Sequence, residues 1–345
     1  MSLARAIETG DVGLLPSRRD EDWKWTDLRG LVRAAPPPSP AWDGPVGSGP
    51  FASVDAEEVC IVNGGGPDRI VVAPGERRAV ALRLIAAPNA GSHLVRVTIA
   101  VGEGAELTLL ESHEGAGEGY LTASDVVIEL APGARVERIV LGSENESGVA
   151  VSIAKVRLAA KTRFDQTVLA SGARRERIET EVEHPGAGAA VRLDGVYLLA
   201  DRRHSDITTV VKHEGVDGVT DQLIKGVVDH QARGVFQGRI VVAEGADKTD
   251  ARMGHHALVL SDRAEVDAKP ELEIWADEVA CAHGNTVGAL DEDALFYAAQ
   301  RGIPQDEARA LLIQAFVGVV VDRIGHDGAR QVAGEWVAQK LGASS

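Results

Sequence analysis

The chain has 345 residues, 44% of them hydrophobic, which is enough for one large β architecture or for two to three smaller modules. Lys and Arg number 36 against 52 Asp and Glu, and the net charge of −16 argues against proteins that bind nucleic acid or anionic membranes, since both need a basic surface. Two cysteines, Cys60 and Cys281, are too few for a disulfide framework or for an all-cysteine metal site within one chain. The thiols are sparse and the N-terminus has no apolar signal-peptide core, so we expect a cytoplasmic protein. The sequence has no long apolar run, so we expect no membrane-spanning helix.

Residues 1–53 are expected to form an N-terminal helical module. Residues 2–9 can form a short helix, and the charged stretch 18–28 carries Trp23 and Trp25, for which packing within the module is the expected role. Six prolines between positions 35 and 50 exclude a helix or an inner strand there, because proline lacks an amide donor. This stretch is predicted to be an extended linker or an ordered loop.

Residues 54–290 are predicted to be a long β region. Val95, Val97 and Ile99 alternate with more polar residues, and the same period of two recurs further along the chain, as expected for strands with two different faces. Turn-forming Gly and Pro pairs separate these runs. No convincing amphipathic helix interrupts the region, so a mainly β fold is expected.

Some turns recur at a nearly constant step. Gly104, Gly133, Lys161 and Gly188 each open a new alternating run, and they are separated by 29, 28 and 27 residues. A β repeat of this length favours stacked turns of a solenoid, in which each turn buries its apolar face against its neighbours. A two-sheet sandwich with regular hairpins is the alternative.

Residues 291–345 return to helical spacing. Pro304 can open a helix, Asp306 and Glu307 suit its first turn, and apolar residues from Ala308 to Val320 follow the spacing of one helical face. Residues 325–328 are expected to be a turn, followed by a last short helix over 332–341.

The candidate chemistry centres on Cys281 and His283. Positions i and i+2 of a strand share a face, so the thiol and the imidazole would lie close together, and both can bind a metal. Two ligands are too few for a closed metal site. From spacing alone, a buried cysteine beside a histidine that is hydrogen-bonded within the fold is favoured over a metal site. His255 and His256 are adjacent in sequence and would point to opposite faces of a strand. No nucleotide-binding P-loop motif is present.

The segment from Thr249 to Ile324 closely resembles the SufB/SufD family of iron–sulfur cluster assembly proteins. The resemblance is carried by several runs along this segment. They are Thr249–Met253, His256–Ser261, Leu295–Tyr297, Arg301–Ile303, Ala315-Phe316, the ordered string from Ala264 through Pro270-Glu-Leu-Glu-Ile274, and Ala276-Asp-Glu-Val-Ala-Cys-Ala-His-Gly284. The last run, together with Trp23-Lys24-Trp25-Thr26, resembles the SufD branch. The usual pattern of that branch has Ala where Asn285 stands here, a departure that could alter the contacts of His283.

This resemblance implies a right-handed parallel β-helix flanked by N-terminal and C-terminal α-helical regions. It implies a non-catalytic scaffold that pairs with a SufB-like subunit through the β-helix and with a SufC-like ABC ATPase through the C-terminal helices. The residues expected to contact the ATPase are Phe296, Tyr297, Arg301, Gly302, Ile303 and Phe316. His283, with Cys281 as a second candidate, would contact iron or an iron–sulfur cluster transiently at the subunit interface. The isolated chain would hold no tightly bound cofactor.

Two other functions stay open at this stage. A β-helical carbohydrate-active enzyme would need paired carboxylates and exposed aromatic residues in a cleft, and aromatic residues make up only 4% of the chain. A SufB-like homodimeric scaffold is the other possibility, and a homodimer could also form when the partner is missing.

Overall fold

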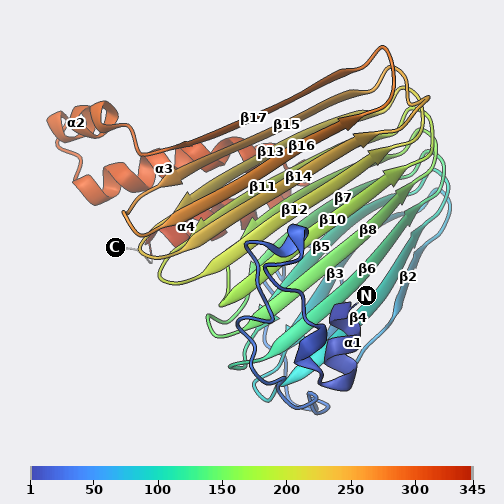
Figure 1. The fold of residues 1–345 in the computed structure, drawn as a ribbon, viewed down its shortest axis with the longest axis horizontal. Helices are drawn as coiled ribbons and strands as arrows, with labels where there is room; N and C mark the ends of the chain where they lie inside the picture. The colour runs from blue at the N-terminus through green and yellow to red at the C-terminus, as the bar shows by residue number, and fades with distance from the viewer. Residues whose placement is uncertain (1, 343–345) are drawn as a thin grey trace.

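The computed structural model describes residues 2–342 and shows a parallel β-solenoid with helices near both ends (Figure 1). Successive strands alternate between two sheets, so that strands with odd numbers form one sheet and strands with even numbers form the other. Every pairing between neighbouring strands is parallel. This arrangement confirms the solenoid and excludes the sandwich, whose sheets would be antiparallel.

The nine strands of the first sheet, in spatial order, are β1 Glu57–Val62, β3 Arg77–Ala86, β5 Glu106–Gly115, β7 Arg135–Ser143, β9 Arg163–Ala170, β11 Ala190–Leu199, β13 Val219–Val228, β15 Asp250–Val259 and β17 Ala280–Gly288. The eight strands of the second sheet are β2 Arg69–Val72, β4 Ser92–Val101, β6 Leu121–Leu130, β8 Val149–Leu158, β10 Arg175–His184, β12 His204–His213, β14 Arg233–Val242 and β16 Glu265–Ile274. The strands therefore begin at Glu57 and end at Gly288, close to the predicted limits of 54 and 290.

The step of the sequence repeat equals the offset between paired residues of neighbouring strands. Glu106 of β5 lies beside Arg135 of β7, which lies beside Arg163 of β9, so neighbouring turns are offset by 29 and then 28 residues. The turn residues Gly104, Gly133, Lys161 and Gly188 all have positive φ. They also form a ladder, because the amide of Gly104 donates to Pro132, that of Gly133 to Ala160, and that of Lys161 to Ala187.

The interior between the two sheets is packed mainly with Val, Ile, Leu and Ala. Alternation places these residues on the inner face of each strand. Polar residues occur at some inner positions as well. Arg138 and Glu111 are fully buried there, with Arg138 Nη2 2.7 Å from Glu111 Oε1, and the guanidinium also donates to Gln166. The narrow interior explains the low aromatic content of the chain.

The N-terminal segment lies on the outer face of the second sheet rather than forming a separate globule (Figure 1). It contains α1 Ser2–Thr9, as expected, and two short 3-10 helices, η1 Val12–Leu14 and η2 Glu21–Trp23. Apolar residues of this segment, among them Leu3, Ile7 and Leu15, pack against outward residues of β6 and β8.

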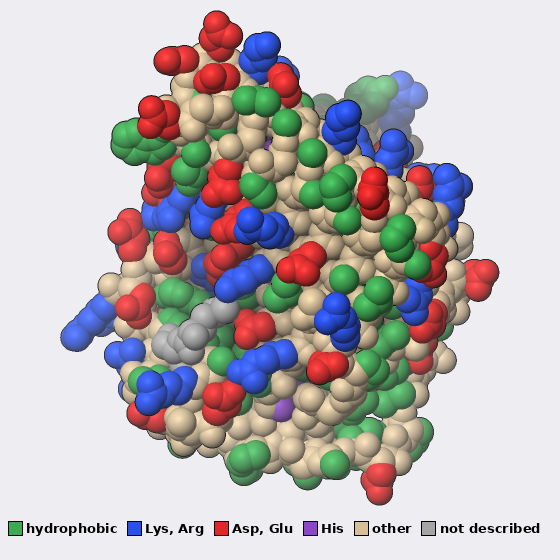
Figure 2. Space-filling view, turned by 90° about the vertical axis from the view of Figure 1, so that its right-hand side faces the viewer, with side chains coloured by type: hydrophobic (Ala, Val, Ile, Leu, Met, Phe, Trp, Pro, Cys, Tyr) green, Lys and Arg blue, Asp and Glu red, His purple; other side chains and the backbone are tan. Residues whose placement is uncertain are grey.

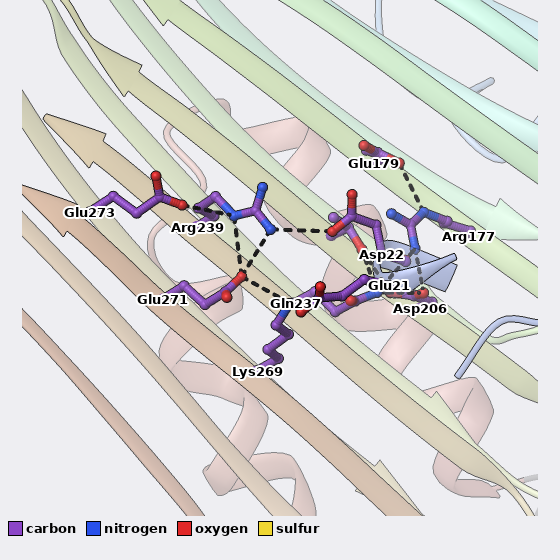
Figure 3. Close-up of polar contacts among 11 residues, drawn as sticks. Glu21, Asp22, Arg177, Glu179, Asp206, Gln237, Arg239, Lys269, Glu271 and Glu273 are labelled. Atoms are coloured by element: carbon purple, nitrogen blue, oxygen red, sulfur yellow. Dashed lines mark hydrogen bonds and ion pairs between the residues drawn. The ribbon is translucent and has the colours of Figure 1, made fainter. Parts of the chain in front are cut away.

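A polar network that includes Glu21 and Asp22 spans strands β10, β12, β14 and β16, as Figure 3 shows. Arg177 bonds Asp206 at 2.9 Å and the carbonyl of Asp22 at 2.6 Å, and its guanidinium lies 4.3 Å from the centre of the Trp23 ring. Thr26 donates to Asp206 at 2.5 Å. Trp23 therefore contacts the solenoid, and its packing is with the outer face of a sheet.

The proline-rich stretch is an ordered loop that covers the first turns of the solenoid. Pro38 forms a bridge with Ser92 at the start of β4, and Ser39 bonds His93 at 2.8 Å. Asn63 donates to the carbonyl of Pro40, and Arg83 donates to the carbonyl of Gly47.

The C-terminal region consists of α2 Glu292–Gln300, α3 Gln305–Val321 and α4 Asp327–Gly342. The predicted helix that begins after Pro304 is confirmed as α3. The last helix begins at Asp327 rather than at 332, inside the stretch predicted to be a turn. Helices α3 and α4 pack on the outer face of the first sheet, and Arg323 anchors their connection through Asp194 and Asp221.

The surface carries many charged side chains of both signs, as expected for a sequence with 36 basic and 52 acidic residues. Figure 2 shows acidic and basic side chains interspersed with hydrophobic ones on one face of the molecule. Among residues 2–342, no helix is long and apolar enough to cross a membrane.

Candidate functional site at the open end of the solenoid

The last turn of the solenoid, made of β16 and β17, has no further turn stacked on it. The two strands end their respective sheets, and after Gly288 the chain leaves the sheet for α2 (Figure 1). Inner residues of β15 such as Met253 and His255 are buried, whereas inner residues of β17 are largely exposed. The interior of the solenoid is therefore uncovered at this end, and both terminal strands keep an unpaired edge.

Cys281 and His283 lie on the inner face of β17. Cys281 is half-buried against the apolar interior beside Ala251, and His283 is exposed beside Met253. Burial raises the pKa of the Cys281 thiol, so the isolated chain carries a protonated thiol rather than a ready metal ligand. The structure thus places the two candidate residues on one face.

The two residues do not make a complete metal site by themselves. Within the described residues, no group of three or more His, Cys, Asp or Glu side chains is placed to hold a metal ion. An exposed imidazole and a neighbouring thiol can supply two ligands, and iron–sulfur centres in proteins use more. Any iron held here would need further ligands from outside residues 2–342.

His255 and His256 point to opposite faces, as alternation requires. His256 is only partly buried and bonds Thr286 at 2.7 Å. His255 is fully buried and bonds both Tyr197, at 2.9 Å, and Asn285, at 2.6 Å. The pair therefore does not form a shared metal site.

The residues expected to bind the ATPase lie on α2, on α3 and in the turn between them, which holds Arg301, Gly302 and Ile303. Phe296 and Tyr297 on α2 are 67% and 61% exposed, and Arg301 donates to the Tyr297 hydroxyl at 2.8 Å. Gly302 has φ +79°, which allows the sharp turn between the two helices. Phe316 on α3, unlike Phe296 and Tyr297, is partly buried against the solenoid, and the amino group of Lys225 lies over its ring. Ile303 is also partly buried.

The sequence did not reveal the chain of contacts from Asn285 through His255 to Tyr197. These residues lie 30 and 58 positions apart, and only the parallel register brings them together. The offset of about 30 residues between turns is the signal that could have found the first contact, since it places residue 285 beside residue 255.

Comparison with known proteins identifies the class. Residues 84–316 match the family model for the SufBD core domain of SUF-system FeS cluster assembly. The iron–sulfur cluster assembly protein SufD of Escherichia coli is 31% identical over 280 residues, which cover 79% of this chain and 66% of the relative. SufD of Bacillus subtilis is 30% identical over 176 residues, covering 47% of this chain and 40% of the relative. A SufBD family protein of Synechocystis is 30% identical over 238 residues, covering 66% and 52%.

The chain therefore belongs to the SufB/SufD family of iron–sulfur cluster assembly proteins. Within that family it is of the SufD type, as the match to SufD of two bacteria shows. The chain spans between two fifths and two thirds of the length of these three relatives. Membership of this family removes the support for a carbohydrate-active enzyme.

Proposed function

We propose that the chain is a non-catalytic scaffold subunit of a cytoplasmic SufBCD-type complex. In this proposal the open end of the solenoid pairs with a SufB-like subunit, and the C-terminal helices bind a SufC-like ABC ATPase. The observation that carries the proposal is the uncovered last turn, which presents unpaired strand edges together with Cys281 and His283.

The difference between the two ends of the solenoid supports a partner at the C-terminal end. At the other end, β2 has only four residues and the proline-rich loop lies over the neighbouring turn, features that hinder strand addition. At the open end, β16 and β17 have ten and nine residues, and Trp275 and Val287 are 71% and 49% exposed. An extended exposed edge suits pairing with a strand of another chain.

We propose that His283 ligates iron or a nascent cluster as cargo, with the remaining ligands supplied by the SufB-like subunit. The imidazole is exposed, so a second chain can approach it. Cys281 is the second candidate ligand. Its raised pKa requires that a metal displace its proton, since only the thiolate binds.

The pairing is tested by co-purification with the SufB-like and SufC-like proteins of the same organism. Val287→Asp places a charge on the inner face of the open end and should abolish recovery of the SufB-like subunit. Val71→Asp is the matched control, because Val71 is 51% exposed at the other end of the solenoid. Equal loss with both variants, or a wild-type chain that binds neither partner, would reject the proposal.

Binding of the ATPase is tested separately. Phe296→Ala combined with Tyr297→Ala should remove the SufC-like subunit and leave the SufB-like subunit bound. Val219→Ala, at an exposed position on β13, is the control. Retention of the ATPase by the double variant would exclude α2 as its binding site.

The role of His283 is tested in cells and in the purified complex. His283→Ala should leave the complex assembled but impair delivery of iron–sulfur clusters. Because the side chain is exposed, its removal leaves no cavity in the fold. Normal cluster delivery by this variant would remove His283 from the proposed site. A chain that purifies as a stable homodimer and assembles clusters without a SufB-like subunit would favour the homodimeric alternative.

A further inference from the structure

A hydrogen-bonded chain runs from the open end into the interior. Asn285 follows His283 by two positions on the same face of β17, and its side-chain oxygen Oδ1 lies 2.6 Å from Nδ1 of His255. On its other side, His255 Nε2 lies 2.9 Å from the hydroxyl of Tyr197. Both His255 and Tyr197 have no exposed surface, so only Asn285 reaches the surface.

Packing allows the imidazole little freedom. The ring of His255 stacks on Phe236, with ring centres 4.9 Å apart and planes inclined by 14°, and the Tyr197 ring stacks at 6.0 Å. Tyr197 in turn fills the space over Gly226 and Gly234, where a side chain would collide with its ring. The imidazole can therefore neither rotate nor move without disturbing the interior.

The proton positions follow from the partners. A fully buried phenol hydroxyl donates when an acceptor is in reach, and here that acceptor is His255 Nε2. Burial lowers the pKa of His255 to about 4, so the ring is neutral at pH 7 and carries its one proton on Nδ1. Nδ1 then donates to Asn285 Oδ1. This assignment fixes the amide with its oxygen inward and its NH2 group toward the surface.

The outward NH2 group is available to a ligand. The hydrogen bonds described for residues 2–342 engage Asn285 through its oxygen, toward His255. Residues two apart on a strand are separated by about 6.6 Å. This spacing would allow both side chains to contact one bound centre.

We propose that Asn285 also contacts the centre bound at His283. Its side-chain amide, held in place by His255 and Tyr197, donates a hydrogen bond to anionic sulfur of that centre. This inference rests on the proposed function of His283. His255 and Tyr197 act as positioning residues. Hydrogen bonds to cluster sulfur stabilise the more negative, reduced state, so the amide raises the reduction potential of the bound centre.

The first test needs no metal. Nitrogen-15 NMR of the isolated chain labelled at histidine should show His255 as the neutral Nδ1–H tautomer between about pH 5.5 and 8. In Asn285→Ala, the Nδ1–H signal should shift because its acceptor is gone. A Nε2–H tautomer in the wild-type chain would turn the amide around, leaving its oxygen outward, and would overturn the proposal.

The second test uses the complex with its SufB-like partner, loaded with ferrous iron and inorganic sulfide. Asn285→Ala should lower the reduction potential of the centre, and His255→Phe should do the same by releasing the amide. Thr286→Ala is the control, because Thr286 points to the opposite face and should leave the potential unchanged. Equal potentials for Asn285→Ala and Thr286→Ala would refute the role of Asn285.

Loss of the His283 site and loss of the Asn285 contact give different results. If His283→Ala loads as well as wild type, the proposed function of His283 is wrong, and this inference falls with it. If His283→Ala fails to load while Asn285→Ala keeps the wild-type potential, only the role of Asn285 is wrong.

Discussion

Arg138 and Glu111 form an ion pair inside the solenoid, whose interior is otherwise packed mainly with aliphatic residues. Burial alone would raise the pKa of Glu111, but the charge of Arg138 and the hydrogen bond from His113 outweigh it and hold that pKa at about 2. Each of the two charges is therefore stabilised in the low-dielectric interior by the opposite charge beside it.

Replacing Arg138 with Met should destabilise the fold by about 3–5 kcal/mol, because it leaves the Glu111 carboxylate buried without its cation. Urea unfolding of the purified chain measures the change. Arg77→Met is the control, since the side chains of Arg77 and Glu106 are 80% and 41% exposed and such pairs contribute little. Equal midpoints for both variants would show that Glu111 is neutral in the folded chain.

At the scale of single elements, the turns that begin the strands of the first sheet depend on a left-handed residue. Gly188 has φ +67°, and nothing lies within 4 Å of the position its Cβ would take. Only backbone strain would therefore oppose a side chain there.

Gly188→Ala should destabilise the chain by about 1 kcal/mol. Alanine lowers the conformational entropy of the unfolded chain, which favours folding, but the strain of a left-handed alanine in the folded chain is larger. Gly47→Ala isolates the strain, since that position is equally open but lacks positive φ and should be neutral or slightly stabilising. Thermal unfolding of both variants measures the difference, and an unchanged Gly188→Ala midpoint would mean that the turn can relax.

The N-terminal segment offers a second test at this scale. Trp23 lies against the buried guanidinium of Arg177, so Trp23→Ala should loosen residues 18–29 from the sheet. Trypsin cleavage after Lys24 and Arg29 should become severalfold faster. Trp275→Ala removes a tryptophan that is 71% exposed and should leave the cleavage rate unchanged. If both variants resist trypsin as wild type does, other contacts hold the segment.

The sequence allowed much of this architecture to be predicted, because a solenoid is built from local repeats. The alternation around Val97 and the spacing of Gly104, Gly133 and Gly188 specify inner faces and turns, and both are properties of neighbouring residues. The attachment of Asp22 and Trp23 to Arg177 could not be predicted, since it joins residues more than 150 positions apart across an outer sheet face. The start of α4 at Asp327 was missed because two glycines flank the position.

For the candidate site, spacing placed Cys281 and His283 on one face but could not reveal their exposure. Exposure depends on whether another turn follows, and the sequence after Gly288 shows only a change of period. The resemblance to a known family, rather than the residue pattern, singled out His283.

At the scale of the whole molecule, the interior and the outer sheet faces hold histidines that cannot easily be protonated. Burial lowers the pKa values of His93, His184, His204 and His255 to about 4 and, together with His184, that of His213 to about 3. Their pKa in the unfolded chain is near 6.5. Between pH 6.5 and 4 the unfolded chain therefore binds protons that the folded chain does not.

The free energy of unfolding should consequently fall as the pH drops from 6.5 to 4, by about 1.4 kcal/mol per pH unit for each histidine. Glu176 and Asp194 oppose this trend, because burial raises their pKa values to about 7 and the folded chain keeps their protons. Burial also raises the pKa values of Glu144 and Glu179, which therefore oppose the trend as well, and the five histidines outnumber these four carboxyls. Urea unfolding at pH 7 and pH 5 checks the sign.

A variant identifies the groups responsible for this pH dependence. His184→Leu should reduce the slope by about one proton, because burial lowers the pKa of His184 to about 4 in the folded chain. Stability that rises on acidification would mean that the buried carboxyls dominate.

The uncovered last turn also has a consequence for a chain that stands alone. Its two long strand edges, one on β16 and one on β17, can pair with any extended chain, including another copy of itself. Under the proposed pairing, a partner subunit would hide both edges, and every unassembled copy would be prone to aggregation and accessible to proteases. The proposal therefore predicts that the amount of this chain is matched to the amount of the subunit that covers it.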